Sequence, residues 1–433
     1  MKIRRTYIRY LSLSVIGMLG LSFYILADTY FISNKLGAEG LAALNLALPL
    51  YGIINGIGLL LGIGGATRYA ILKNQEKNNK NKPYTAAIYL GLIFGVGFFL
   101  AGIFFNEPMA RLLGANEEVI ELTSNYLRIV CCFAPFFILN HILVSFTRND
   151  KAPKHAMAAM LIGSLINVIL DYILIYPANL GMSGAAIATG MAPIIGITIC
   201  LSRKRGFRIS GVPSLQESKR LIPIGTSAFI NEFSSTVVML TFNLLILKLA
   251  GNLGVAAYGI VANIALVATS IFNGVAQGIQ PLCSNAYAKA NELQLKRLLR
   301  YGIFTVLVFG ILIYVGTWAF ATPLANMFGG SKDIELSKLA SEGIRLYFTT
   351  FLIAGFNILL VAYLSATEKA NKAILFSSFR GVIFVVLFAV ILSKVMGLTG
   401  IWLSMLFTEI VTLILYLLTI LYRKRKNFTG NQG

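Results

Sequence analysis

Two polar residues, Asn167 and Asp171, interrupt a mostly apolar stretch from Ala156 to Ile175. In a helix their four-residue spacing places both side chains on one face, one turn apart. Asp28 lies in a similar apolar stretch, from Tyr10 to Ser33. A carboxylate at the centre of a membrane helix costs about 2.5–3.5 kcal/mol on insertion scales, so it needs a proton, a cation or a polar partner. These residues therefore predict a proton or cation site within the membrane.

A hydroxyl group extends this candidate site. Thr189 lies in a later apolar stretch and, with Asp28, Asn167 and Asp171, offers hard oxygen ligands. Such ligands suit Na⁺ or a proton better than a transition metal. The chain has only 2 histidines, so a zinc site is not expected. The alternative is that these groups only hydrogen-bond neighbouring helices to one another.

The second half of the chain contains further intramembrane acids. Glu232 follows Asn231, and this pair is the expected contact for a cationic substrate, with Glu232 a possible second protonation point. The alternative is polar packing, for example against Ser234. Glu409 has no clear role in the sequence, and the hydroxyl of the adjacent Thr408 could satisfy it.

The rest of the composition is that of a membrane protein. The chain has 433 residues, of which 57% are hydrophobic and 12% charged, whereas about a quarter of a soluble domain is charged. Stretches long enough to cross a bilayer, about 20 residues each, recur along the chain. We expect an all-α polytopic protein with twelve spans, near 10–33, 43–67, 84–105, 126–146, 156–176, 183–202, 222–247, 255–283, 301–322, 346–366, 374–394 and 399–422.

The distribution of positive charge predicts the topology. Most of the 37 Lys and Arg residues lie in the amino terminus, in every second loop and in the carboxyl-terminal tail. This positive-inside pattern predicts that both termini are cytoplasmic. Because the charges are spread over short loops, no nucleic-acid surface is expected. The first stretch lacks a cleavage site, so no signal peptide is expected, and the four cysteines lie within predicted spans as core residues.

The sequence also contains an internal repeat. Four segments recur in the same order, offset by 214 to 218 residues: Lys35–Ala43 with Leu249–Ala257, Phe105–Gly114 with Phe320–Gly329, Asp150–Lys154 with Glu368–Lys372, and Gly181–Gly184 with Gly397–Gly400. Six spans per copy is an even number, so the copies should run parallel. We expect an amino-terminal lobe at 1–202, a basic cytoplasmic linker at 203–220 and a carboxyl-terminal lobe with a basic tail at 221–433. Two such lobes favour alternating access around a central site.

Together these residues resemble the multidrug and toxic compound extrusion (MATE) transporters, over nearly the whole chain. Among bacterial members the chain is most similar to the DinF-like and MepA-like branch. The resemblance rests on these segments in combination: Ala27–Ile32, Gly40–Pro49, Ile166–Asp171, Gly184–Thr189, Asn231–Glu232, Val255–Gly259 and Gln277–Pro281.

The resemblance implies two six-helix lobes in a V shape that exchange amphipathic cationic drugs for H⁺ or Na⁺. It assigns the cation site to Asp28, Asn167, Asp171 and Thr189, with Ala185 as a carbonyl ligand, and the acid of the seventh span to Glu232. Two features depart from the family pattern. The first span has no proline at which to bend, and the tenth has Asn357 where some members have an acid.

Three hypotheses follow. The first is an antiporter of a bacterial cytoplasmic membrane that exports cationic amphiphiles, acts as a monomer among membrane lipids and uses no cofactor other than its coupling ion. The second is a flippase for a lipid-linked oligosaccharide, which would have a cationic cavity. The third, an intramembrane enzyme, is disfavoured because the HExxH, GxSxG and Walker motifs are missing.

Overall fold

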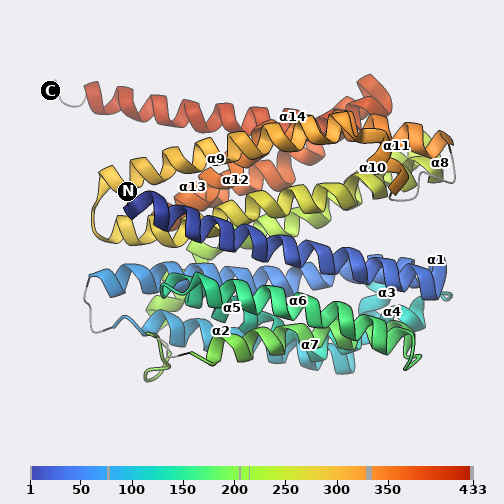
Figure 1. Cartoon of the computed structure of the whole chain (residues 1–433), viewed down its shortest axis with the longest axis horizontal. Helices are drawn as coiled ribbons and strands as arrows, with labels where there is room; N and C mark the ends of the chain where they lie inside the picture. Colours follow the sequence, from blue (N-terminus) through green and yellow to red (C-terminus); the bar gives the residue numbers. More distant parts are fainter. Residues whose placement is uncertain (1, 76–78, 204–205, 214, 328–333, 430–433) are drawn as a thin grey trace.

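The computed structural model describes all residues except 1, 76–78, 204–205, 214, 328–333 and 430–433, and the regular secondary structure of the described residues is all helical (Figure 1). Lys204, Arg205 and Ser214 of the predicted linker, and Gly329 of the predicted repeat, lie outside the described residues. The helices are α1 (Lys2–Asn74), α2 (Lys82–Phe104), α3 (Asn106–Leu112), α4 (Ile120–Cys132), α5 (Ala134–Asn149), α6 (Pro153–Ile175), α7 (Gly181–Leu201), α8 (Leu215–Ala288), α9 (Glu292–Ala319), α10 (Ala321–Met327), α11 (Ile334–Tyr347), η2 (Phe348–Thr350), α12 (Phe351–Ala366), α13 (Ala370–Ser378), η3 (Phe379–Ile383) and α14 (Phe384–Thr429).

Three of these helices are hairpins joined at a glycine. Helices α1, α8 and α14 turn back at Gly37, Gly251 and Gly397, whose φ angles are 63°, 60° and 60°. Residues with a Cβ seldom adopt this left-handed region, whereas glycine adopts it at little cost. Gly181, at the start of α7, has a φ of 53°. Gly37 with Gly251, and Gly181 with Gly397, are glycine pairs of the sequence repeat.

The number of membrane crossings follows from these turns. Among the described residues, 9 stretches are long and apolar enough to cross a membrane, and α4 with α5, bent by 48°, makes a tenth. Two of the stretches, α8 and the segment from α13 through α14, turn back at a glycine and so cross twice. The twelve predicted spans are thereby confirmed.

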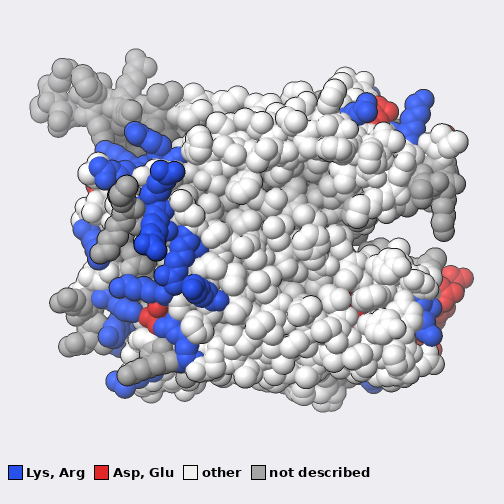
Figure 2. Space-filling view, viewed as in Figure 1, with Lys and Arg blue, Asp and Glu red and all other residues white. Residues whose placement is uncertain are grey.

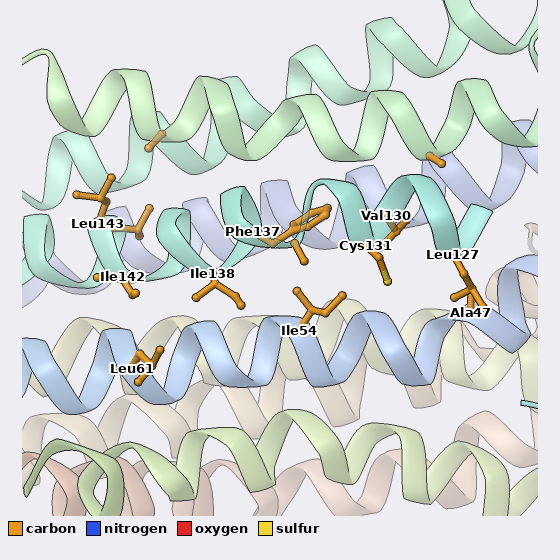
Figure 3. Close-up of a cluster of buried hydrophobic side chains, with 14 of the residues drawn as sticks. Ala47, Ile54, Leu61, Leu127, Val130, Cys131, Phe137, Ile138, Ile142 and Leu143 are labelled. Atoms are coloured by element: carbon orange, nitrogen blue, oxygen red, sulfur yellow. The ribbon is translucent and has the colours of Figure 1, made fainter. Parts of the chain in front are cut away.

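The crossings form two lobes, with α2–α7 on one side of the molecule and α9–α14 on the other (Figure 1). Each lobe has its own buried apolar cluster. In the amino-terminal lobe, Ala47, Ile54 and Leu61 recur every seven residues along one face of α1. They point toward Ile138, Ile142 and neighbouring residues of α4 and α5 (Figure 3).

Some contacts cross the predicted lobe boundaries, which stay a prediction. Tyr7 and Val15, near the start of α1, belong to the apolar cluster of the carboxyl-terminal lobe. Phe207, from the predicted linker, is 2% exposed, and its ring centroid lies 4.7 Å from that of Tyr84 in the amino-terminal lobe. The first helix therefore spans both lobes, whereas Phe207 packs on one.

One repeat match shifts by one residue. The sequence aligns Asp150 with Glu368, but the residues with positive φ are Lys151 (65°) and Glu368 (54°). Each lies two residues before the next helix, which starts at Pro153 or Ala370. Aligning the two halves by this backbone turn therefore gives an offset one residue shorter than aligning Asp150 with Glu368.

The two ends of the molecule differ in charge. Lys and Arg side chains gather at one end, which we call the basic end, where α1 begins and α14 finishes (Figures 1 and 2). At the opposite end the two lobes separate and the surface is hollowed between them (Figure 2). The structure agrees with termini at one end. That this end faces the cytoplasm stays a prediction.

Candidate functional site

Three helices of the amino-terminal lobe bring the predicted cation-site residues together. Asp28 lies on α1, Asn167 and Asp171 on α6, and Thr189 on α7, and all four are buried. The Asn167 side chain donates to Thr189 Oγ1 at 3.5 Å. With its amide turned over, Asn167 donates to Asp171 Oδ2 at 3.1 Å and accepts from the Thr189 N–H at 3.2 Å. In this second orientation Asn167 connects the Asp171 carboxyl to the backbone of Thr189.

The two carboxyls of this site are close and incompletely satisfied. Asp28 and Asp171 interact electrostatically. The Oδ1 atom of each is buried and receives no hydrogen bond from the described residues. A buried carboxylate oxygen without a donor is costly, and a proton or a cation would relieve the cost. Ala185 is buried one turn before Thr189, and its role as a carbonyl ligand stays a prediction.

Within the described chain, no three His, Cys, Asp or Glu residues cluster so that they could hold a metal ion. Two carboxylates, an amide and a hydroxyl form a smaller set of hard oxygen ligands. This donor set fits Na⁺ or a proton and does not fit a transition metal.

Three tyrosines surround the site, and the sequence analysis missed them. Tyr126, on α4, lies beside Thr189 and interacts electrostatically with both acids. The hydroxyls of Tyr24 and Tyr51, on α1, are 2.8 Å apart. The chain has 19 tyrosines, and no spacing in the sequence distinguishes these three.

A cavity of about 190 Å³ lies between the lobes. Tyr24, Tyr51 and Thr189 line it from the amino-terminal lobe, and Asn231 and Glu232 from the carboxyl-terminal lobe. Asp28, Asn167 and Asp171 lie behind this wall rather than on it. Thr189 therefore belongs to both the buried site and the cavity, whereas Glu232 belongs to the cavity alone.

The prediction that Thr408 could satisfy Glu409 is wrong. The Thr408 hydroxyl donates to the Ser404 carbonyl at 2.8 Å. Glu409 accepts instead from Arg380 Nε at 2.6 Å and from the Asn357 side chain at 2.6 Å. Arg380 also donates to Asn231 at 2.9 Å, which holds that cavity residue in place. Arg380 lies within a predicted span, so its charge was the signal in the sequence that could have revealed this partner of Glu409.

Contacts between the lobes close the cavity toward the basic end. Arg68, on α1, forms ion pairs with Glu217 on α8 and with Glu368 of the loop before α13. Gln280 donates to Thr67 Oγ1 at 3.2 Å. The Asn74 side chain donates to Asn285 Oδ1 at 2.7 Å.

Two helical lobes, a central cavity sealed at one end and buried acids beside it define the class of secondary membrane transporters. Comparison with known proteins gives the family. The MatE family model matches residues 14–173 and 227–391. The chain belongs to this family, the MATE transporters, and is MepA-like.

Relatives match along nearly the full length. The chain is 30% identical to the multidrug export protein MepA of Staphylococcus saprophyticus, over 97% of this chain and 93% of that protein. It is 29% identical to MepA of Staphylococcus aureus strain MSSA476, over 91% of this chain and 88% of that protein. A solved structure of a MATE family transporter in an outward-facing conformation superposes with a TM-score of 0.89 at 23% identity, covering 95% of this chain and 94% of that one.

Proposed function

We propose that this protein exports amphipathic cations across a bacterial cytoplasmic membrane in exchange for H⁺ or Na⁺. The observation that carries the proposal is the pair of buried acids, Asp28 and Asp171, each with an unsatisfied oxygen. The pair lies behind a cavity whose wall carries Glu232. The MepA relatives, named as multidrug export proteins, support export as the direction of transport and more than one drug as substrate.

The arrangement supports coupling between the ion site and the cavity through one residue, Asn167. Proton or Na⁺ binding between Asp28 and Asp171 would change the contacts of Asn167, which hydrogen-bonds Thr189 on the cavity wall. One charge moving through 100 mV releases roughly 2.3 kcal/mol. That energy supports more than a tenfold solute gradient at about 1.4 kcal/mol per decade. Glu232 supplies the negative charge that would attract a cationic solute.

The test is ethidium efflux from cells that express the wild type, Asp28→Asn, Asp171→Asn or Glu232→Gln at matched membrane levels. Runs with and without a proton uncoupler, and with and without Na⁺, identify the coupling ion. We expect both aspartate variants to lose energy-dependent efflux. Glu107→Gln is the control because Glu107 is exposed on α3. Unchanged efflux in both aspartate variants would contradict the coupling site.

The oligosaccharide flippase of the second hypothesis should have a cationic cavity. Here the lining carries one carboxylate, Glu232, and one guanidinium, Arg148, so its formal charges balance. The cavity therefore favours the antiporter. Failure of the wild type to export any cationic dye would favour the flippase.

A further inference from the structure

Arg148 is a buried cation without an acidic partner. It lies in the last turn of α5, is 4% exposed and lines the cavity between the lobes. No Asp or Glu oxygen of the described residues forms an ion pair with its guanidinium. Its one side-chain hydrogen bond, 3.7 Å long, runs to Met160 Sδ, and a thioether is a weak acceptor. Burying a charge without a partner is expensive.

Two other arginines of the helices are paired. Arg68, which is buried, meets Glu217 and Glu368, and Arg380, which is partly buried, meets Glu409. The acid nearest to Arg148 in sequence, Asp150, is engaged elsewhere.

Four donors hold Asp150 in place. Asp150 accepts from Lys73 at 2.6 Å, from the Gly206 N–H at 2.8 Å, from Arg203 at 3.1 Å and from Tyr69 at 3.1 Å. Asp150 therefore does not supply a counter-charge for Arg148.

The cavity places Arg148 and Glu232 at different depths. A side chain at Gly52 would meet Thr236 and one at Gly56 would meet Phe229, so Glu232 lies level with the α1 turn between these glycines. A side chain at Gly62 would meet Ser145, and Arg148 lies one turn further toward the basic end. The two levels are separated by about ten residues of α1, or roughly 15 Å at 1.5 Å per residue.

We propose that Arg148 is an anion-binding site at the basic end of the cavity, which takes the carboxylate of a soluble amphiphile. The cationic group of the same solute faces Glu232. A guanidinium suits this role because it binds a carboxylate through two parallel N–H···O bonds. The inference rests on the proposed export function and adds a preference within its cationic substrates, for those that also carry an anionic group at the opposite end.

The test compares a rhodamine with a free carboxylate and the methyl ester of the same rhodamine, which is only cationic. Fluorescence anisotropy measures the dissociation constant of each dye for the full-length protein in lipid nanodiscs. We expect the wild type to bind the free acid more tightly than the ester. Arg148→Gln should weaken binding of the free acid about tenfold, because a hydrogen bond to a charged group contributes about 1.5–3 kcal/mol. Binding of the ester should change less than twofold.

Two further variants complete the test. Arg148→Lys keeps the charge but not the two-bond geometry, so its affinity for the free acid should lie between those of the wild type and Arg148→Gln. Arg111→Gln is the matched control because Arg111 is exposed on α3 and pairs with Glu107 and Glu117.

A wild type that binds the ester as tightly as the free acid overturns the inference, whatever the variants do. Equal changes for both dyes in Arg148→Gln also overturn it. Ethidium efflux from cells that express the same proteins separates this result from the proposed function. A wild type that exports ethidium but does not prefer the free acid overturns only the anion site. A wild type that prefers the free acid but does not export ethidium contradicts the export function.

Discussion

Tyr126 lies where the buried acids approach the cavity. Its hydroxyl is beside Thr189 and interacts electrostatically with Asp28 and Asp171. We expect Tyr126→Phe to slow ethidium efflux about fivefold, because one hydrogen bond contributes about 1 kcal/mol. The control is Tyr89→Phe, since Tyr89 is 41% exposed on α2. Equal rates in the two variants would assign Tyr126 to packing.

The ion pair of Arg380 and Glu409 predicts a stability effect. Glu409 is fully buried, and Glu409→Gln leaves Arg380 as an uncompensated charge. Breaking one side of a buried pair costs about 3–5 kcal/mol, whereas replacing both sides with apolar residues is often neutral. Thermal unfolding should show a large loss of Tm for Glu409→Gln and a smaller one for Arg380→Met with Glu409→Met. Similar losses of Tm in both proteins would show that the uncompensated charge of Arg380 is not the cause of the loss.

Asp150 follows α5, outside the spans, and predicts a dependence on pH. Burial raises the pKa of Asp150, but hydrogen bonds from Lys73, from the Gly206 N–H and from Tyr69 outweigh this and lower it overall. A carboxyl with a lowered pKa stabilises the fold above its unfolded pKa of about 3.9, and this stability is lost as pH falls through the folded pKa. The Tm of the wild type should therefore fall below about pH 4, and that of Asp150→Asn should fall less. Parallel curves would contradict the assignment.

At the scale of the helices, glycines set how closely α1 and α8 approach near the basic end. A methyl group at Gly64 would collide with the backbone of Leu221, and one at Gly225 with the backbone of Leu60. We therefore expect Gly64→Ala and Gly225→Ala to separate the lobes at this end and to reduce efflux. Gly97→Ala is the control, because a methyl group there meets nothing within 4 Å. Normal efflux in all three variants would show that the lobes adjust to the added methyl.

These helices also show what the sequence could predict. Apolar length predicted twelve spans because the bilayer fixes that length, and the repeat paired Gly37 with Gly251, which share a positive φ. The packing of Tyr7 and Val15 against the opposite lobe could not be predicted. It depends on the crossing of α1 and α8, and the apolar pattern of a membrane helix does not specify a partner.

The same limit applies to the candidate site. Asp28, Asn167 and Asp171 stand out because charged and amide groups are costly in an apolar stretch. Arg380 carries the same cost, but its partner Glu409 lies 29 positions away, and sequence spacing did not connect them. Tyr126 gives no such signal, because tyrosine is common in membrane helices.

At the scale of the whole molecule, the lobes are sealed at the basic end and separated at the other (Figure 2). The seal includes the Arg68 ion pairs and the hydrogen bond between Asn74 and Asn285, at 2.7 Å. If transport alternates between two open states, this seal must break once in each cycle. A covalent bond across it should hold the protein with the far end open.

We therefore expect a disulfide between Asn74→Cys and Asn285→Cys, in a chain without its four native cysteines, to abolish efflux. The parent chain must itself transport, and each single-cysteine variant serves as a control. Reduction should restore efflux, because it removes the bond and leaves the residues in place. Binding of the cationic dye should persist in the oxidised protein, since the cavity stays open at the far end. Efflux that continues after complete cross-linking would show that the lobes need not separate at the basic end.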